Sequence, residues 1–240
     1  MPPSATQHLD ELENAALSDT QEFGTHLLFR DAPAPSLDEL SDFASQISEL
    51  TAVWLATADV HSARAAQWQV KHELSPLQAR VSFYSSQPLS LDRFATQEFA
   101  QHAMLYRGET HRVLQPPVAI GERFHGTVQI ALFCKRPELN EASFESIWRD
   151  DHTSVALETQ STVGYTQNRI LEKRGSERWV DALVEEYFPP EAGDSVGHFF
   201  AAPHNPDKLT LHIERMNTSC ARFIDLAGIE VMHLSDVRVR

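Results

Sequence analysis

The chain has 240 residues, of which 42% are hydrophobic and 22% charged, and this composition excludes collagen-like, coiled-coil and wholly disordered proteins. Its 20 basic and 34 acidic residues give a formal net charge of −14. Because such a charge repels the phosphates of nucleic acids and of anionic membranes, we expect neither as a partner.

The sequence contains no targeting or anchoring signal that we can identify. Its start lacks the basic and apolar segments of a secretory signal, and no apolar run is long enough to span a bilayer. The two cysteines, Cys134 and Cys220, form neither a disulfide framework nor a zinc ligand set. We therefore expect a cytoplasmic protein with two core thiols and a short N-terminal arm over residues 1–20.

Residues 21–121 follow the order βαββαβ. Strand patterns occur at 25–30, 53–59, 80–85 and 110–114, and helical patterns at 36–50 and 90–105. Ser36 and Glu39 have the spacing of a capping box at the start of the first helix. One face of that helix carries apolar residues at helical spacing: Leu37, Leu40, Phe43, Ile47 and Leu50.

Residues 126–240 repeat this order. Strands are expected at 128–135, 162–171, 178–188 and 230–240, with helices beginning near Asn140 and over 209–226. Two such copies predict an α+β protein made of two tandem ferredoxin-like repeats. Each repeat has helices on one face of its sheet only, so we expect the two bare faces to pack face to face as an eight-stranded barrel.

Three motifs in the second copy occur in a characteristic order. A Lys-Arg-Pro turn leads into a helix with Phe144, Trp148 and His152 at four-residue steps, Gly164-Tyr165 and Asn168 lie on the next strand, and WVDALVEEYF follows with Asp181 and Glu185. Together they resemble the EthD family of the dimeric α/β-barrel superfamily. The resemblance implies a fused pseudo-dimer and a lyase, isomerase or cyclase in a degradation or polyketide-like pathway, often without a cofactor.

The first copy has no counterpart of Trp148 and His152. We therefore expect one site per chain, between the first helix of the second copy and its own sheet. The equivalent space in the first copy should be filled by Leu40, Phe43 and Ile47.

The predicted catalytic residues are His152, Tyr165 and Glu185. An imidazole exchanges protons near neutral pH, which suits enolisation of a small aromatic or carbonyl compound. A core histidine that binds a backbone carbonyl is the structural alternative. Glu185 shares its strand face with Tyr187 and acts either as a pocket acid or base or as the partner of an arginine across the barrel.

The predicted substrate-binding residues are Trp148, Asn168, Tyr187, Phe199 and Phe200. Strand alternation puts Tyr165 and Asn168 on opposite faces, so only one of them should touch substrate unless a bulge intervenes. The alternative for Tyr165 is a purely structural role in the sheet. Phe199 and Phe200 lie in a loop rich in proline that either covers the pocket as a lid or packs on a neighbouring subunit.

Two other functions are compatible with the sequence. One is a non-catalytic small-molecule-binding or accessory protein of a degradation pathway. The other is a haem protein, because other branches of the superfamily bind haem and His198 or His212 could ligate its iron. We expect no cofactor and no metal, since metal-binding and phosphate-binding motifs are absent, and the expected partners are a small-molecule substrate and a second copy in a homodimer.

Overall fold

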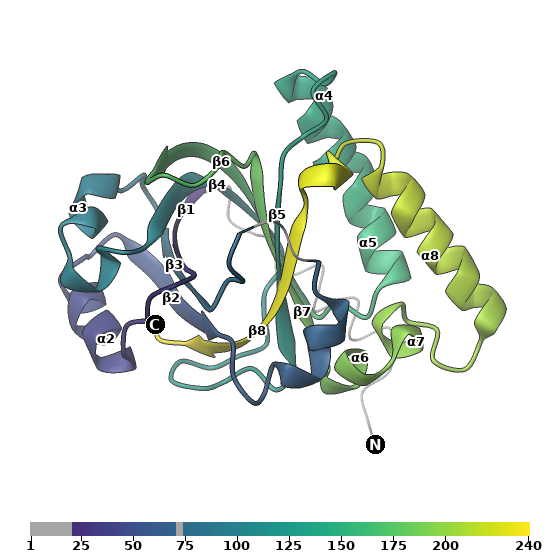
Figure 1. The fold of residues 1–240 in the computed structure, drawn as a ribbon, viewed down its shortest axis with the longest axis horizontal. Coiled ribbons are helices and arrows are strands. Elements are labelled where there is room, and N and C mark those ends of the chain that lie inside the picture. The colour runs from purple at the N-terminus through teal and green to yellow at the C-terminus, as the bar shows by residue number, and fades with distance from the viewer. Residues whose placement is uncertain (1–20, 71–73) are drawn as a thin grey trace.

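The computed structural model describes residues 21–70 and 74–240, so the arm expected over residues 1–20 lies outside the described residues. Eight strands form a closed barrel in the order β1-β3-β2-β8-β5-β7-β6-β4 (Figure 1). Every neighbouring pair of strands is antiparallel. The expectation of an α+β protein with an eight-stranded barrel is confirmed.

The first half contributes four adjacent strands in the order β2-β3-β1-β4. Its first helix begins at Ser36, where the expected capping box with Glu39 is present. The elements of this half are β1 (Glu22–Phe29), α2 (Leu37–Ser45), β2 (Leu50–Thr57), η1 (Ala63–Trp68), β3 (Ala79–Ser85), α3 (Leu91–Ala95), η2 (Glu98–Ala100) and β4 (Met104–Leu114).

The second half contributes the other four strands in the order β8-β5-β7-β6. Its elements are β5 (Thr127–Phe133), α4 (Glu141–Glu145), η3 (Ser146–His152), α5 (Thr153–Thr159), β6 (Gly164–Arg174), β7 (Ala182–Phe188), α6 (Pro190–Asp194), α7 (Val196–Phe199), α8 (Pro206–Cys220), η4 (Leu226–Gly228) and β8 (Glu230–Arg238).

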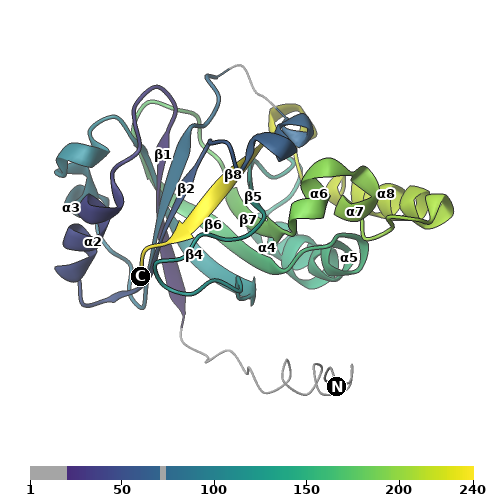
Figure 2. The ribbon, with the colours of Figure 1, turned by 90° about the horizontal axis from the view of Figure 1, so that it is seen from below.

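The two sets of strands join edge to edge. β2 pairs with β8 at one seam and β4 pairs with β6 at the other, which closes the sheet on itself. Helices α2 and α3 cover one side of the barrel, and α5 to α8 gather on the opposite side (Figure 2). Both faces of most strands are therefore covered, the inner face by the barrel interior and the outer face by helices.

Three apolar clusters follow from this arrangement. One fills the barrel interior and includes Trp54, Tyr84 and Tyr187. The second lies between the first-half strands and α2 and α3, and the third lies between the second-half strands and the helices around α5 and α8.

Some element boundaries differ from the sequence prediction. A single helix over 90–105 is wrong, because α3 ends at Ala95 and the strand β4 already begins at Met104. The helix expected over 209–226 begins at Pro206 and ends at Cys220. Both cysteines are unpaired and partly exposed rather than fully buried. In residues 21–70 and 74–240, no helix has the length and apolar character needed to cross a membrane.

Candidate functional site

A hollow of about 330 Å³ lies between the second-half helices and the outer face of their sheet. Its wall is mainly apolar and aromatic, and a few polar side chains interrupt it. The lining residues are Trp68, Val70, Gln129, Ala131, Phe133, Trp148, His152, Gln160, Tyr165, Val184, Glu186, Phe199, Phe200, Met216, Asn217, Cys220, Phe223, Ile224, Ile229 and Val231. We call it the α5–α8 pocket. A mostly apolar hollow with few polar groups is typical of a small-molecule site.

One helical wall of this pocket contains the motif of Phe144, Trp148 and His152. Asn140 caps α4 by accepting a hydrogen bond from the backbone N–H of Ser143 at 2.8 Å. The chain then continues through η3, a π-helical turn of the kind often found at functional sites. Phe144 and Trp148 are stacked at 5.2 Å between ring centres, Trp148 also packs on Phe133 of β5, and His152 lines the pocket.

His152 is buried and neutral in this wall. Its Nδ1 lies 2.9 Å from the hydroxyl of Ser219 on α8, and its ring is 4.8 Å from the ring of Phe223. Burial and, to a smaller extent, the charge of Arg222 lower the pKa of His152 to about 4. An imidazole that accepts from Ser219 at Nδ1 carries its proton on Nε2, so it acts as a hydrogen-bond donor at neutral pH.

The sheet side of the pocket has a row of polar residues across three strands. Glu186 on β7 is the cross-strand partner of Tyr165 on β6 and of Gln129 on β5. Side chains directly opposite each other lie about 4.5–5.5 Å apart at Cβ. The amide of Gln129 donates to Glu186 at 2.9 Å, and the hydroxyl of Thr162 donates to its other oxygen at 3.5 Å.

Glu186 supplies a carboxyl group to the pocket. It is 6% exposed, and no lysine or arginine of residues 21–70 and 74–240 lines the pocket with it. Burial raises its pKa to about 7, although the hydrogen bonds from Thr162 and Gln129 oppose that shift. A carboxyl group with this pKa exchanges a proton readily at neutral pH, which is the property required of a general acid or base.

Five of the eight residues predicted from the sequence line the α5–α8 pocket: His152, Tyr165, Trp148, Phe199 and Phe200. Tyr165 accepts a hydrogen bond from Gln167 at 2.9 Å, and burial raises its pKa, so its hydroxyl stays protonated. Phe199, at the end of α7, stacks on Phe188 with 4.4 Å between ring centres.

The other three predicted residues, Glu185, Tyr187 and Asn168, lie in the barrel interior instead. Glu185 is 3.1 Å from Arg80, and it accepts hydrogen bonds from Ser82 at 2.8 Å and from Tyr84. Burial alone would raise the pKa of Glu185, but Arg80 and these hydrogen bonds hold it below its ordinary value.

Tyr187 and Asn168 belong to the same interior. Tyr187 donates to Asp236 at 2.6 Å, and Asp236 also binds Arg80 at 3.0 Å. Asn168 accepts from the hydroxyl of Thr110 at 2.7 Å. The expectation that Glu185 or Tyr187 shares a pocket with His152 is therefore corrected, because alternate residues of a strand face opposite sides of the barrel wall. Glu185 pairs with an arginine across the barrel, the alternative left open by the sequence.

The first half also contributes to the α5–α8 pocket. After η1, Val70 forms two backbone hydrogen bonds with Val231 of β8, both 2.9 Å long. The indole N–H of Trp68 donates to the carbonyl of Ala192 at 3.1 Å, and its ring lies 6.2 Å from that of Phe199. We call residues 63–70 the strap, because they fasten the first half across the wall of the pocket.

The equivalent space between the first-half helices and their sheet is packed. Leu40, Phe43 and Ile47 are buried in the apolar cluster there, where Phe43 contacts the rings of Phe83 and Phe94 at 5.6 Å each. Each such side chain contributes about 1.5–3 kcal/mol by its burial. These side chains fill the space that corresponds to the pocket of the second half.

Comparisons with known proteins inform the fold. No protein-family model matches the chain, and no curated protein matches it significantly in sequence. Among solved structures, an anthrone oxidase-like protein is similar at 8% identity and a TM-score of 0.53, with 92% of each chain covered. A chlorite dismutase from Candidatus Nitrospira defluvii in complex with imidazole is similar at 11% identity and a TM-score of 0.45, covering 92% of this chain and 94% of that one.

The chain has the dimeric α/β-barrel fold. This fold is the one expected from the sequence, whereas membership of the EthD family stays a prediction. At such low identity the likeness extends to the fold alone.

The described residues that line the α5–α8 pocket do not fit a haem. A haem presents two propionate groups that need cationic partners, yet residues 21–70 and 74–240 contribute no lysine or arginine to this lining and do contribute the carboxyl group of Glu186. Neither His198 nor His212 lines the pocket, and His212 places its Nδ1 2.7 Å from the carbonyl of Phe200. Residues 21–70 and 74–240 also contain no group of three metal-ligating side chains.

Proposed function

We propose that this protein is an enzyme that transfers a proton on a small, uncharged aromatic or enolisable carbonyl compound bound in the α5–α8 pocket. The observation that carries the proposal is Glu186, a buried carboxyl group whose pKa lies near 7 in an aromatic pocket to which the described residues contribute no lysine or arginine. The reaction class is the isomerase, lyase or cyclase chemistry expected from the sequence, with Glu186 in the role first given to Glu185.

The proton transfer uses groups that this chain holds in place. The ionised carboxylate of Glu186 removes a proton from the carbon next to the substrate carbonyl. The C–H electron pair forms the new double bond, and the carbonyl π pair moves to oxygen. Neutral His152 or the hydroxyl of Tyr165 donates a hydrogen bond to that oxygen, and protonated Glu186 returns the proton to another carbon or to the oxygen.

The aromatic wall accounts for binding in this proposal. Trp148, Phe199 and Phe200 supply apolar surface, with Trp68 from the first half beside Phe199. Aromatic side chains prefer edge or offset contacts with other rings, which favours a planar substrate. Because no lysine or arginine of the described chain lines the pocket, an uncharged substrate is favoured.

The repeat organisation belongs to the same proposal. We propose that residues 21–121 and 126–240 are two ferredoxin-like repeats, fused so that the EthD-like second repeat has the site and the degenerate first repeat serves as its wall. The strand orders β4-β1-β3-β2 and β8-β5-β7-β6 support this, because corresponding strands occupy corresponding places. Association of the fused chain into a homodimer stays a prediction.

Hydrogen–deuterium exchange of anthrone tests the proposed function. Anthrone is a planar, uncharged ketone with an enolisable CH₂ group. One structurally similar protein is anthrone oxidase-like. We expect the protein to accelerate exchange of the CH₂ protons in D₂O, followed by NMR, and Glu186→Gln to reduce that acceleration by at least about 100-fold.

The neighbouring variant Glu185→Asp serves as the control, because its side chain faces the barrel interior. Exchange that is equally fast with Glu186→Gln would exclude Glu186 as the base. If the protein binds anthrone but gives no acceleration, it is instead the non-catalytic binding protein that the sequence also allows.

A further inference from the structure

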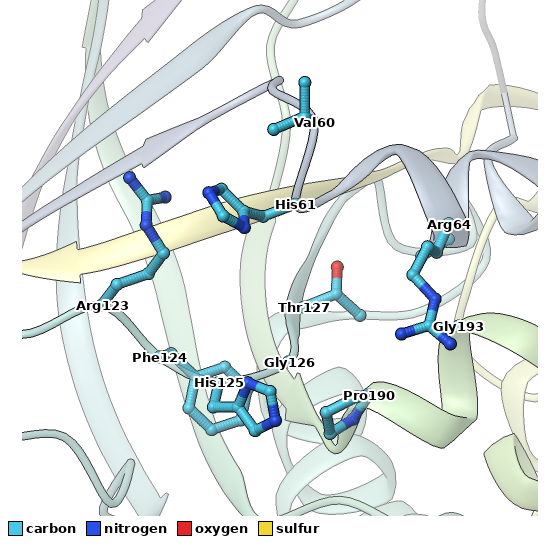
Figure 3. A pocket seen from close by; sticks show the side chains of 11 residues that line it. Val60, His61, Arg64, Arg123, Phe124, His125, Gly126, Thr127, Pro190 and Gly193 are labelled. Atoms are coloured by element: carbon cyan, nitrogen blue, oxygen red, sulfur yellow. The ribbon is translucent and has the colours of Figure 1, made fainter.

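A second hollow, of about 400 Å³, lies where the two halves of the chain meet (Figure 3). The segment after β2 and the start of η1 form one wall, and residues 123–127 and α6 form the others. It shares no lining residue with the α5–α8 pocket. This hollow has no part in the function proposed for the α5–α8 pocket.

The side chains around this hollow have an unusual charge for so acidic a protein. His61, Arg64, Arg123 and His125 all line it, and no aspartate or glutamate of the described residues does. The chain as a whole has a formal net charge of −14. In Figure 3, Arg123 and Arg64 stand on opposite sides of the hollow, with the two histidines between them.

Aspartates outside the lining hold both arginines in position. Asp194 accepts a hydrogen bond from Nε of Arg64 at 2.8 Å, and Asp59 accepts one from Nη1 of Arg123 at 3.0 Å. Each aspartate occupies one side of a guanidinium group that has five N–H donors. Within the described part of the chain, Nη1 of Arg64 and Nε and Nη2 of Arg123 make no hydrogen bond to protein.

This arrangement favours a ligand that supplies oxygen acceptors. The aspartates balance much of the arginine charge, so the attraction acts at short range through charge-assisted hydrogen bonds. Side chains that are already held in place lose less conformational entropy when a ligand binds. The ring nitrogens of His61 and His125 make no hydrogen bond to the described residues and add further donors or acceptors.

The hollow also has an apolar side. Phe124 is 6% exposed and packs against Tyr187 with 5.2 Å between ring centres, and Pro190 lies next to it in the lining. A ligand with only charged groups would leave this surface unused. The structure therefore favours an anionic group attached to an apolar body.

We propose that this second hollow binds a small organic anion, in which a carboxylate or a phosphate monoester contacts the basic side chains and an apolar body contacts Phe124 and Pro190. The binding is independent of the reaction proposed for the α5–α8 pocket. The two hollows even favour opposite ligands, an anion here and an uncharged molecule there.

Titration of the full chain with benzoate and with phenyl phosphate at low salt tests the proposal. NMR signals of the histidine rings report the location, since His61 and His125 mark this hollow and His152 marks the α5–α8 pocket. We expect saturable shifts of His61 and His125 with at least one probe at concentrations up to about 10 mM. Comparison of the two probes tells whether carboxylate or phosphate is preferred.

Variants distinguish a built site from general attraction to positive charge. His61→Asn combined with His125→Asn leaves both arginine–aspartate pairs intact, and Arg123→Gln removes one of them. Isothermal titration should show at least about tenfold weaker binding for each, whereas Arg93→Gln, on the far side of the first half, should bind as the unmodified protein does. The proposal is overturned if neither probe binds, if the shifts occur at His152 instead, or if all variants bind equally.

Discussion

Glu185 and Glu186 are adjacent in sequence, yet they face opposite sides of the barrel wall and have opposite electrostatic environments. Glu185 is paired with Arg80 and has a lowered pKa, whereas Glu186 has no cationic partner in the described part of the chain and a pKa of about 7. Glu185→Gln should cost about 3–5 kcal/mol of unfolding free energy at pH 7, because it leaves Arg80 short of a charge partner in the interior. Urea unfolding measures this, and a loss below about 1 kcal/mol would contradict it.

Glu186→Gln should have the opposite effect on stability above neutral pH. The folded protein holds the pKa of Glu186 near 7, above the ordinary value of 4.5, so the unfolded chain ionises this group first as the pH rises. Below about pH 4.5 the two proteins should be equally stable. Between about pH 4.5 and 7 the unmodified protein should lose stability relative to the variant, reaching roughly 3 kcal/mol. A difference independent of pH would contradict this.

The same pKa predicts the pH dependence of catalysis. Proton removal needs the carboxylate, so the rate of anthrone exchange should rise with pH and reach half its maximum near pH 7. His152 should not add to this profile, since its pKa of about 4 keeps it neutral over the range. Initial rates measured from pH 5 to pH 9, after subtraction of the exchange in buffer, test this. A falling or flat profile would exclude Glu186 as the base.

Among the elements, the strap makes the first half part of the substrate-binding wall. Trp68 is held by its hydrogen bond to Ala192 and by contact with Phe199, so its ring presents a fixed apolar surface to the pocket. Trp68→Ala should weaken anthrone binding about tenfold, and Trp68→Phe should weaken it less. Titration in the Glu186→Gln background measures binding without turnover.

Trp179→Ala is the matched control for this experiment, because Trp179 is a partly exposed tryptophan outside the lining. Equal weakening by Trp179→Ala and Trp68→Ala would indicate a general loss of structure. Unchanged binding by Trp68→Ala would show that the strap is only a structural connection.

The elements also show where sequence reasoning succeeds and where it stops. The spacing of Phe144, Trp148 and His152 predicts a shared buried face, and all three residues are buried. Alternation along β7 separates Glu185 from Glu186 but does not tell which faces the helices, because every residue of β7 is buried. In a barrel covered by helices, both strand faces are core, and the usual contrast of polar and apolar faces disappears.

The contribution of the strap could not be derived from local pattern at all. Residues 61–77 form a polar stretch between two strand patterns, and nothing in the spacing of this stretch predicts a contact for Trp68. Its place in the pocket depends on the pairing of Val70 with Val231, residues 161 positions apart in the chain (231 − 70). Contacts between such distant segments are set by the closure of the barrel rather than by local preference.

At the scale of the whole molecule, the two halves share an interior that neither can complete alone. Arg80 on β3 of the first half binds both Glu185 on β7 and Asp236 on β8 of the second, and all three are essentially inaccessible to solvent. The β2–β8 and β4–β6 seams add backbone pairing between the halves. Unfolding one half would therefore expose two open sheet edges and leave the buried charges of the other half unpaired.

We therefore expect the two halves to unfold together. Scanning calorimetry should give a single transition whose calorimetric and van't Hoff enthalpies agree. Arg80→Met should lower the midpoint, by about 2–4 °C for each kcal/mol lost, and should keep the transition single because the seams remain. Leu40→Ala, in the outer core of the first half, offers a sharper test. If the halves were independent, this substitution would move only one of two transitions, whereas shared closure requires it to shift the single transition of the entire barrel.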